Sequence, residues 1–504
     1  MKEIQDKIDF NNKVNTKIST LEAELEVLQD KMPNKDLCFL SAVEQAKLIR
    51  TKSISAQELI RAHLDQIEKY NPVLNAIVTL TADSAMADAY AADQALEQGE
   101  KLGVLHGLPV AHKDLFLTKG VRTTFGSLAY KDFVPEVDSL PVERLKKAGG
   151  ISLGKTNTPE FGAGSQTFNA VFGSTPNPYD LTKTCGGSSG GGAVALASGM
   201  VAIADGTDLG GSLRNPASFC NLVGIRPSVG RVPSWPESLG WYTMSVAGPM
   251  ARTVQDLALA MAAMSGPDDR SPISLEAPGE MFLNPLERSF KGCKIAFSAN
   301  LGGLPVEKEV AKVLESTRSV FEELGCEIIN DEPDISEADE IFMLWRAWRT
   351  ELRITPLLKE HRSEIKDTVI WNAEQGLSIT GPQLVRAEAK RTELYLRMRD
   401  FFKKYEFLVL PVSQVAPFSI DQEYPQEING IKMNTYIDWQ KSCYHISALG
   451  NPAISVPAGF TSDQLPVGIQ IVGRHHDDFG ILQLAYAFEQ RTHFAQRRPP
   501  MCQS

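Results

Sequence analysis

Residues 184–231 read TCGGSSGGGAVALASGMVAIADGTDLGGSLRNPASFCNLVGIRPSVGR, two glycine-serine clusters joined by a run of small apolar residues. Glycine lets the backbone adopt positive φ and lets a ligand approach closely. Clustered glycines can also turn several backbone N–H groups toward one point, where they stabilise an anion. Both clusters border apolar helical or strand-like runs, and Asp208 and Arg214 stand among the glycines, which a flexible linker would not require. We therefore interpret the stretch as a structured catalytic or binding element.

A serine in such a turn is a candidate nucleophile and needs a base. Among the histidines, His112 alone stands beside another suggestive feature, because it precedes Lys113 at the end of the strand-like run 108–111. The neighbouring His475 and His476 are interpreted as a solvated loop, since no third ligand is spaced for zinc. Burial can lower a lysine pKa from about 10.4 toward neutrality. The residues alone leave Lys113 either a buried base or, as most lysines are, a surface group.

Two motif matches point to other chemistries. Residues 186–190 fit G-x-S-x-G, the nucleophile elbow, but residues 178–183 before them form a polar turn where that elbow requires an apolar strand. Residues 149–156 fit G-x-x-x-x-G-K-[ST], the phosphate loop. A charged helical segment precedes this loop, its centre is apolar and Pro159 follows, so we expect a helix, a strand and a turn. An ATP-dependent enzyme stays an alternative that nucleotide binding would detect.

Strand-like and helical stretches alternate along the rest of the chain. A helix is expected to begin at Ser55, and others are expected over residues 83–97 and 307–324, with residues 335–405 mostly helical. The short apolar runs interpreted as strands are residues 108–111, 151–153, 294–297, 326–329, 407–410, 453–456 and 467–472. This alternation predicts an α/β fold with a substantially parallel sheet.

Bulk composition narrows the function classes. The 504 residues are 43% hydrophobic and 22% charged, which is typical of a soluble globular protein. The net charge of −11 argues against a nucleic-acid binder, which needs a basic surface. No apolar run is long enough to span a bilayer, so we expect no stable membrane insertion. The seven cysteines form no C-x-x-C pair and no secretory leader is recognised, so a reducing, cytoplasmic setting is expected.

Residues 1–35 differ from the remainder and are treated as a separate helical extension, with the main domain over residues 36–504. Apolar residues fall in a heptad pattern that Pro33 ends, at Val14, Ile18, Leu21, Leu25, Leu28 and Met32. Two interpretations stay open. The segment forms a short coiled coil that pairs subunits into a homodimer, or it is an amphipathic helix that lies on its own domain.

Taken together, the motifs resemble the amidase signature family over roughly residues 40–500. The matching pieces are Gly-Gly-Ser-Ser-Gly-Gly at 186–191 and the segment 206–217, with supporting blocks at 107–114, 154–161, 248–254 and 450–453. The block at 154–161 accounts for the false phosphate loop. Small departures exist, among them Asn221 where glycine is commoner, and none touches the expected catalytic residues.

The resemblance implies a serine hydrolase that cuts carboxylic amide C–N bonds through an acyl-enzyme, with no metal or organic cofactor. It implies Ser212 as nucleophile, Ser188 as a bridging serine that follows a cis peptide bond, and Lys113 as base. Backbone N–H groups of residues 209–212, which are Leu209, Gly210, Gly211 and Ser212, would form the oxyanion hole. Thr207 and Ser189 would support the hydrogen-bond network. The fold implied is a large mixed, largely parallel twisted sheet with helices on both faces.

The family leaves alternatives open. The leading hypothesis is a stand-alone amidase acting on a small-molecule amide. The A subunit of a glutamyl-tRNA amidotransferase, a glutaminase that works with partner subunits, shares the same triad, but residues 158–161 (Thr-Pro-Glu-Phe) differ from the Met-Asp-Glu-Phe typical of that subunit. A non-catalytic scaffold that uses the heptad helix is a third alternative. Trp345, Trp348 and Trp371 either line an aromatic pocket or belong to the core, and the core is favoured for at least two of them.

Overall fold

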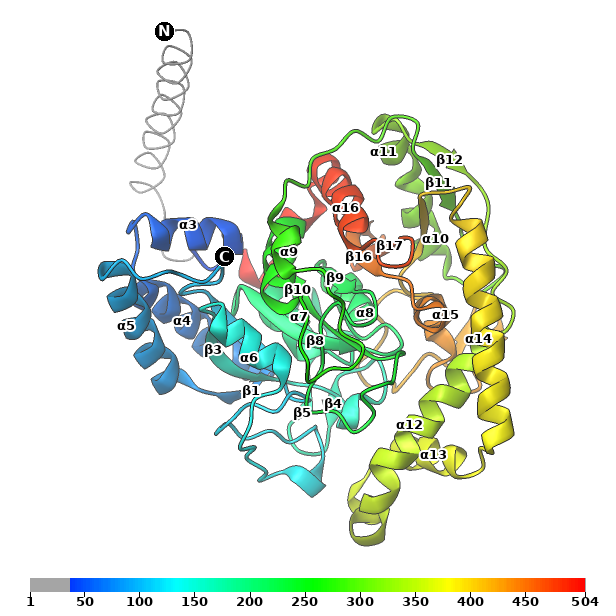
Figure 1. Cartoon of the computed structure of the whole chain (residues 1–504), viewed down its shortest axis with the longest axis horizontal. Helices are drawn as coiled ribbons and strands as arrows, with labels where there is room; N and C mark the ends of the chain where they lie inside the picture. Colours follow the sequence, from blue (N-terminus) through cyan, green and yellow to red (C-terminus); the bar gives the residue numbers. More distant parts are fainter. Residues whose placement is uncertain (1–36, 504) are drawn as a thin grey trace, which may run out of the picture.

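The computed structural model describes residues 37–503, so the heptad segment 1–35 lies outside the described residues and its two interpretations remain predictions. Within the described range, eleven strands form one sheet with helices packed around it (Figure 1). In spatial order, the strands are β1 (Ile77–Leu80), β3 (Ile151–Thr156), β2 (Pro109–Lys113), β8 (Ile203–Asp208), β10 (Val246–Ala251), β9 (Val223–Arg226), β16 (Ala453–Phe460), β17 (Pro466–Val472), β13 (Phe407–Pro411), β11 (Lys294–Phe297) and β12 (Glu327–Ile329).

The sheet is mixed, as predicted, but its parallel part is smaller than expected. Among the described strands, parallel pairing is confined to β3–β2–β8 and to β13–β11–β12. The strands between β8 and β13, and β1 at the edge, pair antiparallel. The reason lies in the connections. β16 and β17 are joined by residues 461–465, which suffice for an antiparallel pair, whereas a parallel pair needs a long crossover.

Both faces of the sheet are covered, because alternate residues of one strand enter different hydrophobic clusters. On β13, Phe407 and Val409 belong to the large cluster, and Leu408 and Leu410 to a second cluster. Successive side chains of a strand point to opposite faces. The helices that supply these layers are α3 (Ala42–Arg50), α4 (Ala56–Leu74), α5 (Ala82–Glu97), α6 (Leu140–Lys147), α7 (Gly190–Ala197), α8 (Arg214–Phe219), α9 (Val254–Met264), α10 (Lys308–Ser316), α11 (Arg318–Glu323), α12 (Ala338–His361), α13 (Asp367–Leu377), α14 (Gly381–Phe401), α15 (Lys441–Leu449) and α16 (Asp478–Thr492).

The helix signals of the sequence are confirmed. Ser55 is the N-cap of α4, and its hydroxyl and the Glu58 side chain close a capping box. The helix expected over 307–324 is divided at Thr317 into α10 and α11. The region 335–405 contains α12, α13 and α14, and α12 packs against both of the others and against α15. In Figure 1 these helices lie at the opposite end of the molecule from α4 and α5.

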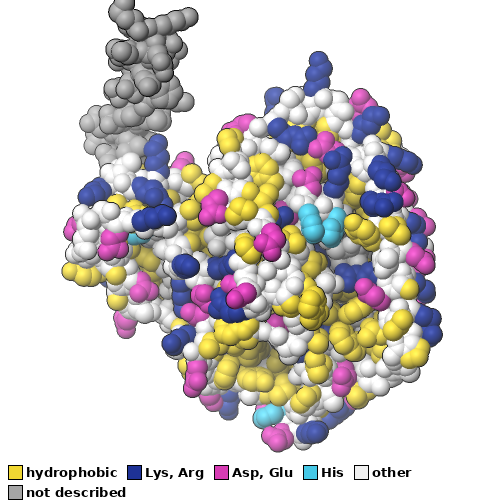
Figure 2. All heavy atoms as spheres, viewed as in Figure 1, with side chains coloured by type: hydrophobic (Ala, Val, Ile, Leu, Met, Phe, Trp, Pro, Cys, Tyr) yellow, Lys and Arg dark blue, Asp and Glu magenta, His cyan; other side chains and the backbone are white. Residues whose placement is uncertain are grey.

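Short two-stranded ribbons lie outside the main sheet. Their strands are β4 (Phe168–Asn169), β5 (Gly173–Ser174), β6 (Pro176–Asn177), β7 (Asp180–Thr184), β14 (Glu427–Ile428) and β15 (Ile431–Lys432). Across residues 37–503 no helix combines the length and the apolar character that crossing a bilayer requires. On the face shown in Figure 2, basic and acidic side chains are interspersed, and neither sign of charge forms a continuous surface.

Candidate functional site

The site is built where the signature stretch meets β2. Strand β8 runs parallel to β2, with Ala111 opposite Ala204, so the carboxyl ends of both strands reach the same edge of the sheet. Lys113 ends β2 and Thr207 lies near the end of β8. Asp205 fixes this edge, because one carboxylate oxygen accepts the Lys113 backbone N–H at 2.7 Å and the other lies 2.6 Å from His112 Nδ1.

Lys113 is fully buried and is surrounded by hydroxyl groups. Its Nζ lies 2.7 Å from Ser188 Oγ, 2.9 Å from Ser189 Oγ and 3.0 Å from Thr207 Oγ1. Burial lowers the lysine pKa from its usual 10.5 to about 7, although the negative charges of Asp208 and Asp205 oppose this shift. The ambiguity left by the sequence is thus resolved in favour of burial, and a large fraction of the amine is neutral near neutral pH.

Ser188 and Ser212 are placed differently relative to Lys113. Ser188 follows a cis peptide bond from Gly187, as the resemblance implied, and lies in direct contact with Lys113. Ser212 stands on the loop between β8 and α8 and opens to a pocket that Ser188 also lines. Among the described residues, no hydrogen bond joins the two hydroxyls. Contacts between catalytic groups are often long in the free enzyme and shorten once substrate is bound.

The loop of residues 209–213 is shaped by Asp208. Its carboxylate accepts the Gly211 N–H at 3.0 Å and the Leu213 N–H at 3.2 Å. In the part of the chain that the structure describes, the N–H groups of Leu209, Gly210 and Ser212 have no hydrogen-bond acceptor. The Gly211 N–H thus donates to Asp208 in this structure, and the oxyanion hole expected from residues 209–212 stays a prediction.

Gly211 has a second reason to be glycine. It has φ +114°, and an added Cβ would lie 2.6 Å from Cys443 Cβ on the neighbouring helix α15. Real Cβ atoms do not approach this closely, and L side chains rarely adopt this φ. The close packing of the loop on α15 therefore depends on this glycine.

Buried arginines hold Asp208 in place. Arg214 donates from Nε and Nη2 to the two carboxylate oxygens of Asp208 at 3.0 and 2.9 Å. Arg226 donates to the backbone carbonyl of Asp208 at 2.6 Å. Burial alone would raise the pKa of Asp208, but the charges of Arg214 and Arg226 hold it well below the ordinary carboxyl range. A paired and hydrogen-bonded buried carboxylate of this kind fixes the geometry of the loop that it caps.

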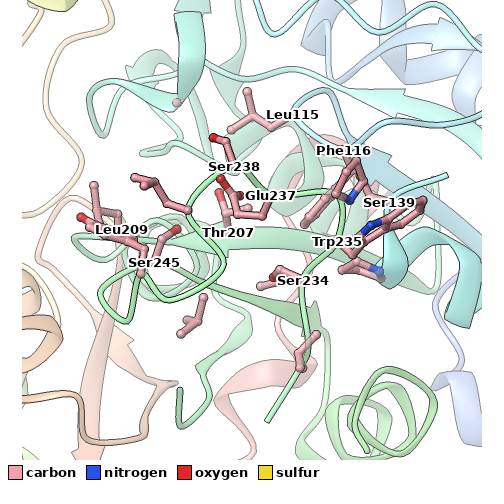
Figure 3. A pocket seen from close by; sticks show the side chains of 18 of the residues that line it. Leu115, Phe116, Ser139, Thr207, Leu209, Ser234, Trp235, Glu237, Ser238 and Ser245 are labelled. Carbon is pink, nitrogen blue, oxygen red and sulfur yellow. The ribbon is translucent and has the colours of Figure 1, made fainter. Parts of the chain in front are cut away.

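Two chambers open on Ser212. The large chamber has a volume of about 310 Å³ and lies between the segment after β2 and the loop of residues 230–247 (Figure 3). The small chamber, of about 90 Å³, lies between residues 161–165 and helix α12. Ser212, Leu209 and Phe161 line both. The aromatic residues that line the large chamber are Phe116, Phe125, Phe161, Trp235 and Tyr242.

The three tryptophans singled out by the sequence do not line either chamber. Trp345 and Trp348 pack on Tyr242, with ring centroids 5.9 and 6.4 Å away, and so support the chamber wall from behind. Trp371 packs against Tyr436, with centroids 6.3 Å apart. All three pack against the second hydrophobic cluster, in agreement with the core interpretation.

The segment that imitates a phosphate loop is a buried strand. Lys155 lies within β3, its ammonium donates to the Phe116 carbonyl and to the hydroxyls of Thr118 and Thr123, and its side chain is fully buried. Burial lowers its pKa to about 8, against the opposing charge of Asp114. The lysine therefore fastens the chain segment after β2, which forms one wall of the large chamber. Nothing in this arrangement cradles a phosphate.

The pocket also contains charged residues that the sequence analysis did not single out. They are Glu237 on the loop of residues 230–247 and Arg346, Arg349 and Arg353 on α12. The three arginines are spaced by three and four residues, which places them on one helix face. That spacing was visible in the sequence, but the chamber that this face borders depends on how α12 packs.

The family model described as Amidase matches residues 58–482. An acylamidase of Rhodococcus erythropolis is 35% identical over 472 residues, covering 93% of this chain and 98% of that protein. The A subunit of a glutamyl-tRNA(Gln) amidotransferase of Moorella thermoacetica is also 35% identical, over 92% of this chain and 99% of that protein. A crystal structure of a bacterial aryl acylamidase of the amidase signature enzymes superposes with a TM-score of 0.85 at 32% identity, covering 91% of this chain and 98% of that one.

Proposed function

This chain belongs to the amidase signature family and is a hydrolase that acts on amides, and we propose that it does so through Lys113, Ser188 and Ser212 with a covalent acyl-enzyme. The observation that carries the proposal is the buried Lys113, with its Nζ 2.7 Å from Ser188 Oγ, beside a pocket that opens on Ser212. A lysine whose pKa lies near 7 can exchange a proton with a serine in the pH range of the cell.

The contacts of Lys113 can be satisfied by an ammonium, which would donate to all three hydroxyls, and equally by a neutral amine. A neutral amine has two N–H bonds and one lone pair, yet three hydroxyl oxygens lie within 3.0 Å of Nζ. Two of them can accept from the amine, so the third must donate to its lone pair. We assign the donating role to Ser188, the hydroxyl at the shortest distance, and the accepting roles to Ser189 and Thr207.

In the proposed reaction, Ser188 passes its proton to Lys113 and takes the proton of Ser212. Ser212 Oγ then forms a bond to the amide carbonyl carbon, and the carbonyl oxygen becomes an oxyanion. The free N–H groups of Leu209, Gly210 and Ser212 are the donors available to it. When the intermediate collapses, the C–N bond breaks and the proton returns through Ser188 to the departing nitrogen. Water repeats the sequence on the acyl-enzyme, releasing the carboxylic acid and regenerating Ser212.

The walls of the large chamber support an acyl amide with an aromatic or apolar group as substrate. Aromatic rings line it, and such sites gain affinity from apolar area together with a few oriented polar groups. The similarity to an acylamidase and to an aryl acylamidase points to the same class.

A glutaminase subunit of an amidotransferase is the second candidate, because relatives with that name match over nearly the whole chain. The two functions differ in a simple assay. A stand-alone amidase hydrolyses an anilide without partner subunits, whereas the glutaminase releases ammonia from glutamine and depends on its partners.

The test of the proposed nucleophile is intact mass after treatment with a fluorophosphonate. We expect one adduct on the unmodified chain, mapped to Ser212, and none on Ser212→Ala. Ser238→Ala is the matched control, since Ser238 lines the same chamber outside the relay, and it should label like the unmodified chain (Figure 3). A folded chain that gives no adduct, or an adduct on another serine, would refute the assignment.

A further inference from the structure

The charged residues around Ser212 are unevenly distributed. Within the described part of the chain, the charged side chains that line the large chamber are Glu237, Arg349 and Arg353. Those that line the small chamber are Arg346, Arg349 and Arg353. The two chambers together thus present three positive charges and one negative charge, which leaves an excess of two positive charges beside the nucleophile.

Of the three arginines, Arg349 alone has an acidic side chain within ion-pair distance among the described residues. Arg346 donates to the Tyr436 hydroxyl at 2.7 Å and lies over the rings of Trp371 and Tyr436, all of them neutral groups. Arg349 has one acidic neighbour, with Nη2 3.8 Å from Glu237, and its buried Nε has no acceptor. Arg353 is exposed as a residue, and its guanidinium has no hydrogen bond or ion pair with any residue of the described chain.

The positive charges of two of these arginines repel each other. Arg349 and Arg353 stand four residues apart on α12, where like charges repel. The charge of Arg349, together with desolvation, lowers the pKa of Arg353 to about 10. A pKa of about 10 still leaves the Arg353 guanidinium charged near neutral pH. An anion placed between the two arginines would relieve the repulsion and occupy donors that are otherwise unused.

We infer that the amides cleaved by this enzyme carry a carboxylate, which Arg349 and Arg353 bind in the chambers beside Ser212. The inference rests on the proposed function and specifies its substrate class. A carboxylate is the matching ligand, because its two oxygens fit the planar fork of a guanidinium. Glu237 lies 3.8 Å from Arg349 and partly offsets its charge, which leaves Arg353 as the principal donor.

The test measures binding with Ser212→Ala, which removes the proposed nucleophile and leaves both arginines. Two pairs of amides differ in charge. In the first pair, para-acetamidobenzoate carries a carboxylate on the amine side of the amide, and para-nitroacetanilide is its neutral near-isostere. In the second pair, glutaric acid monoanilide carries a carboxylate on the acyl side, and valeranilide is its neutral counterpart. Isothermal titration should show at least one carboxylate binding about tenfold to a hundredfold more tightly than its neutral partner.

Further substitutions in the Ser212→Ala chain show which arginine is responsible for the preference for the carboxylate. Arg353→Gln should reduce it to near one, Arg349→Gln should reduce it several-fold, and Arg353→Lys should retain part of it because the charge stays while the fork is lost. Lys359→Gln is the matched control: it removes a positive charge from the same helix at an exposed residue outside both chambers. It should leave the preference unchanged. Thermal midpoints verify that each variant is folded.

The outcomes separate this inference from the proposed function. Equal binding of both members in both pairs, or a preference that persists in folded Arg353→Gln and Arg349→Gln, would overturn the inference. The same amides are then given to the unmodified chain. Preferential binding without any hydrolysis would contradict the proposed function and support the carboxylate site. Hydrolysis without a charge preference would support the proposed function and contradict the carboxylate site.

Discussion

The burial of Lys113 predicts how the reactivity of Ser212 depends on pH. In the proposed relay the lysine accepts a proton only when neutral, so the rate should follow its neutral fraction. A lysine with the usual pKa of 10.5 would be neutral in roughly one molecule in three thousand at about pH 7, whereas one with a pKa of about 7 is neutral in about half. The buried environment is therefore expected to contribute a factor of ~10³ to the rate at neutral pH.

The assay is the second-order rate of fluorophosphonate labelling from about pH 5 to about pH 9, which reports the free enzyme and needs no knowledge of the substrate. The sign follows from the chemistry: protonated Lys113 cannot accept the serine proton. Labelling should therefore fall about tenfold per pH unit below the lysine pKa and reach a plateau above about pH 8. Lys113→Met should label at least ~10²-fold more slowly and lose the pH-dependent limb.

Two results would refute the reasoning. A labelling rate that still rises about tenfold per pH unit up to about pH 9, with no plateau, would mean that the amine is not desolvated in solution as its burial indicates. An unchanged limb in Lys113→Met would mean that another group titrates. His112 is the first residue to examine in that case, because it shares Asp205 with the lysine backbone.

Two further predictions concern the walls of the site. Gly211→Ala should abolish labelling and lower the thermal midpoint, because the new Cβ would lie 2.6 Å from Cys443 Cβ. Gly120→Ala is the control, because Gly120 has φ +74° and open space around it. This control should cost only about 1 kcal/mol of backbone strain and label normally. If both variants label alike, the packing argument is wrong. Lys155→Met should raise KM several-fold by loosening the segment after β2, while the pH midpoint of labelling stays near that of Lys113; a shifted midpoint would instead make Lys155 part of the proton relay.

The sequence predicted the fold best where strands are continuous apolar runs. The runs at 294–297, 407–410 and 467–472 are recovered as β11, β13 and β17 within a residue or so. Strand β8 was missed because its sequence, IADGTD, contains glycine and two aspartates, and these residues are unfavourable in strands. They are tolerated there because Asp205 and Asp208 find buried hydrogen-bond partners, which tertiary contacts alone provide.

For the site, the sequence singled out the proposed reactive residues through their glycine-rich surroundings but could not define their partners. Gly211 shows the limit: the motif suggests a free N–H, and only the structure shows that Asp208 accepts it. Asn221, noted where the family favours glycine, adopts φ +58°, which asparagine tolerates better than most residues. The arginines of α12 were missed because an arginine-bearing helix face usually borders solvent, and here it borders the chambers.

The enclosure of Lys113 has a consequence for turnover as a whole. The amine has no exposed surface, and its polar neighbours are the hydroxyls of Ser188, Ser189 and Thr207. Of these, Ser188 and Thr207 border the large chamber. An amide that fills this chamber therefore closes the route by which the amine could equilibrate with buffer. In the proposed relay, the protonation state present when the substrate enters is then retained until the amine product departs, carrying the proton of Ser212 on its nitrogen. The water that enters afterwards supplies the proton for the second half of the reaction.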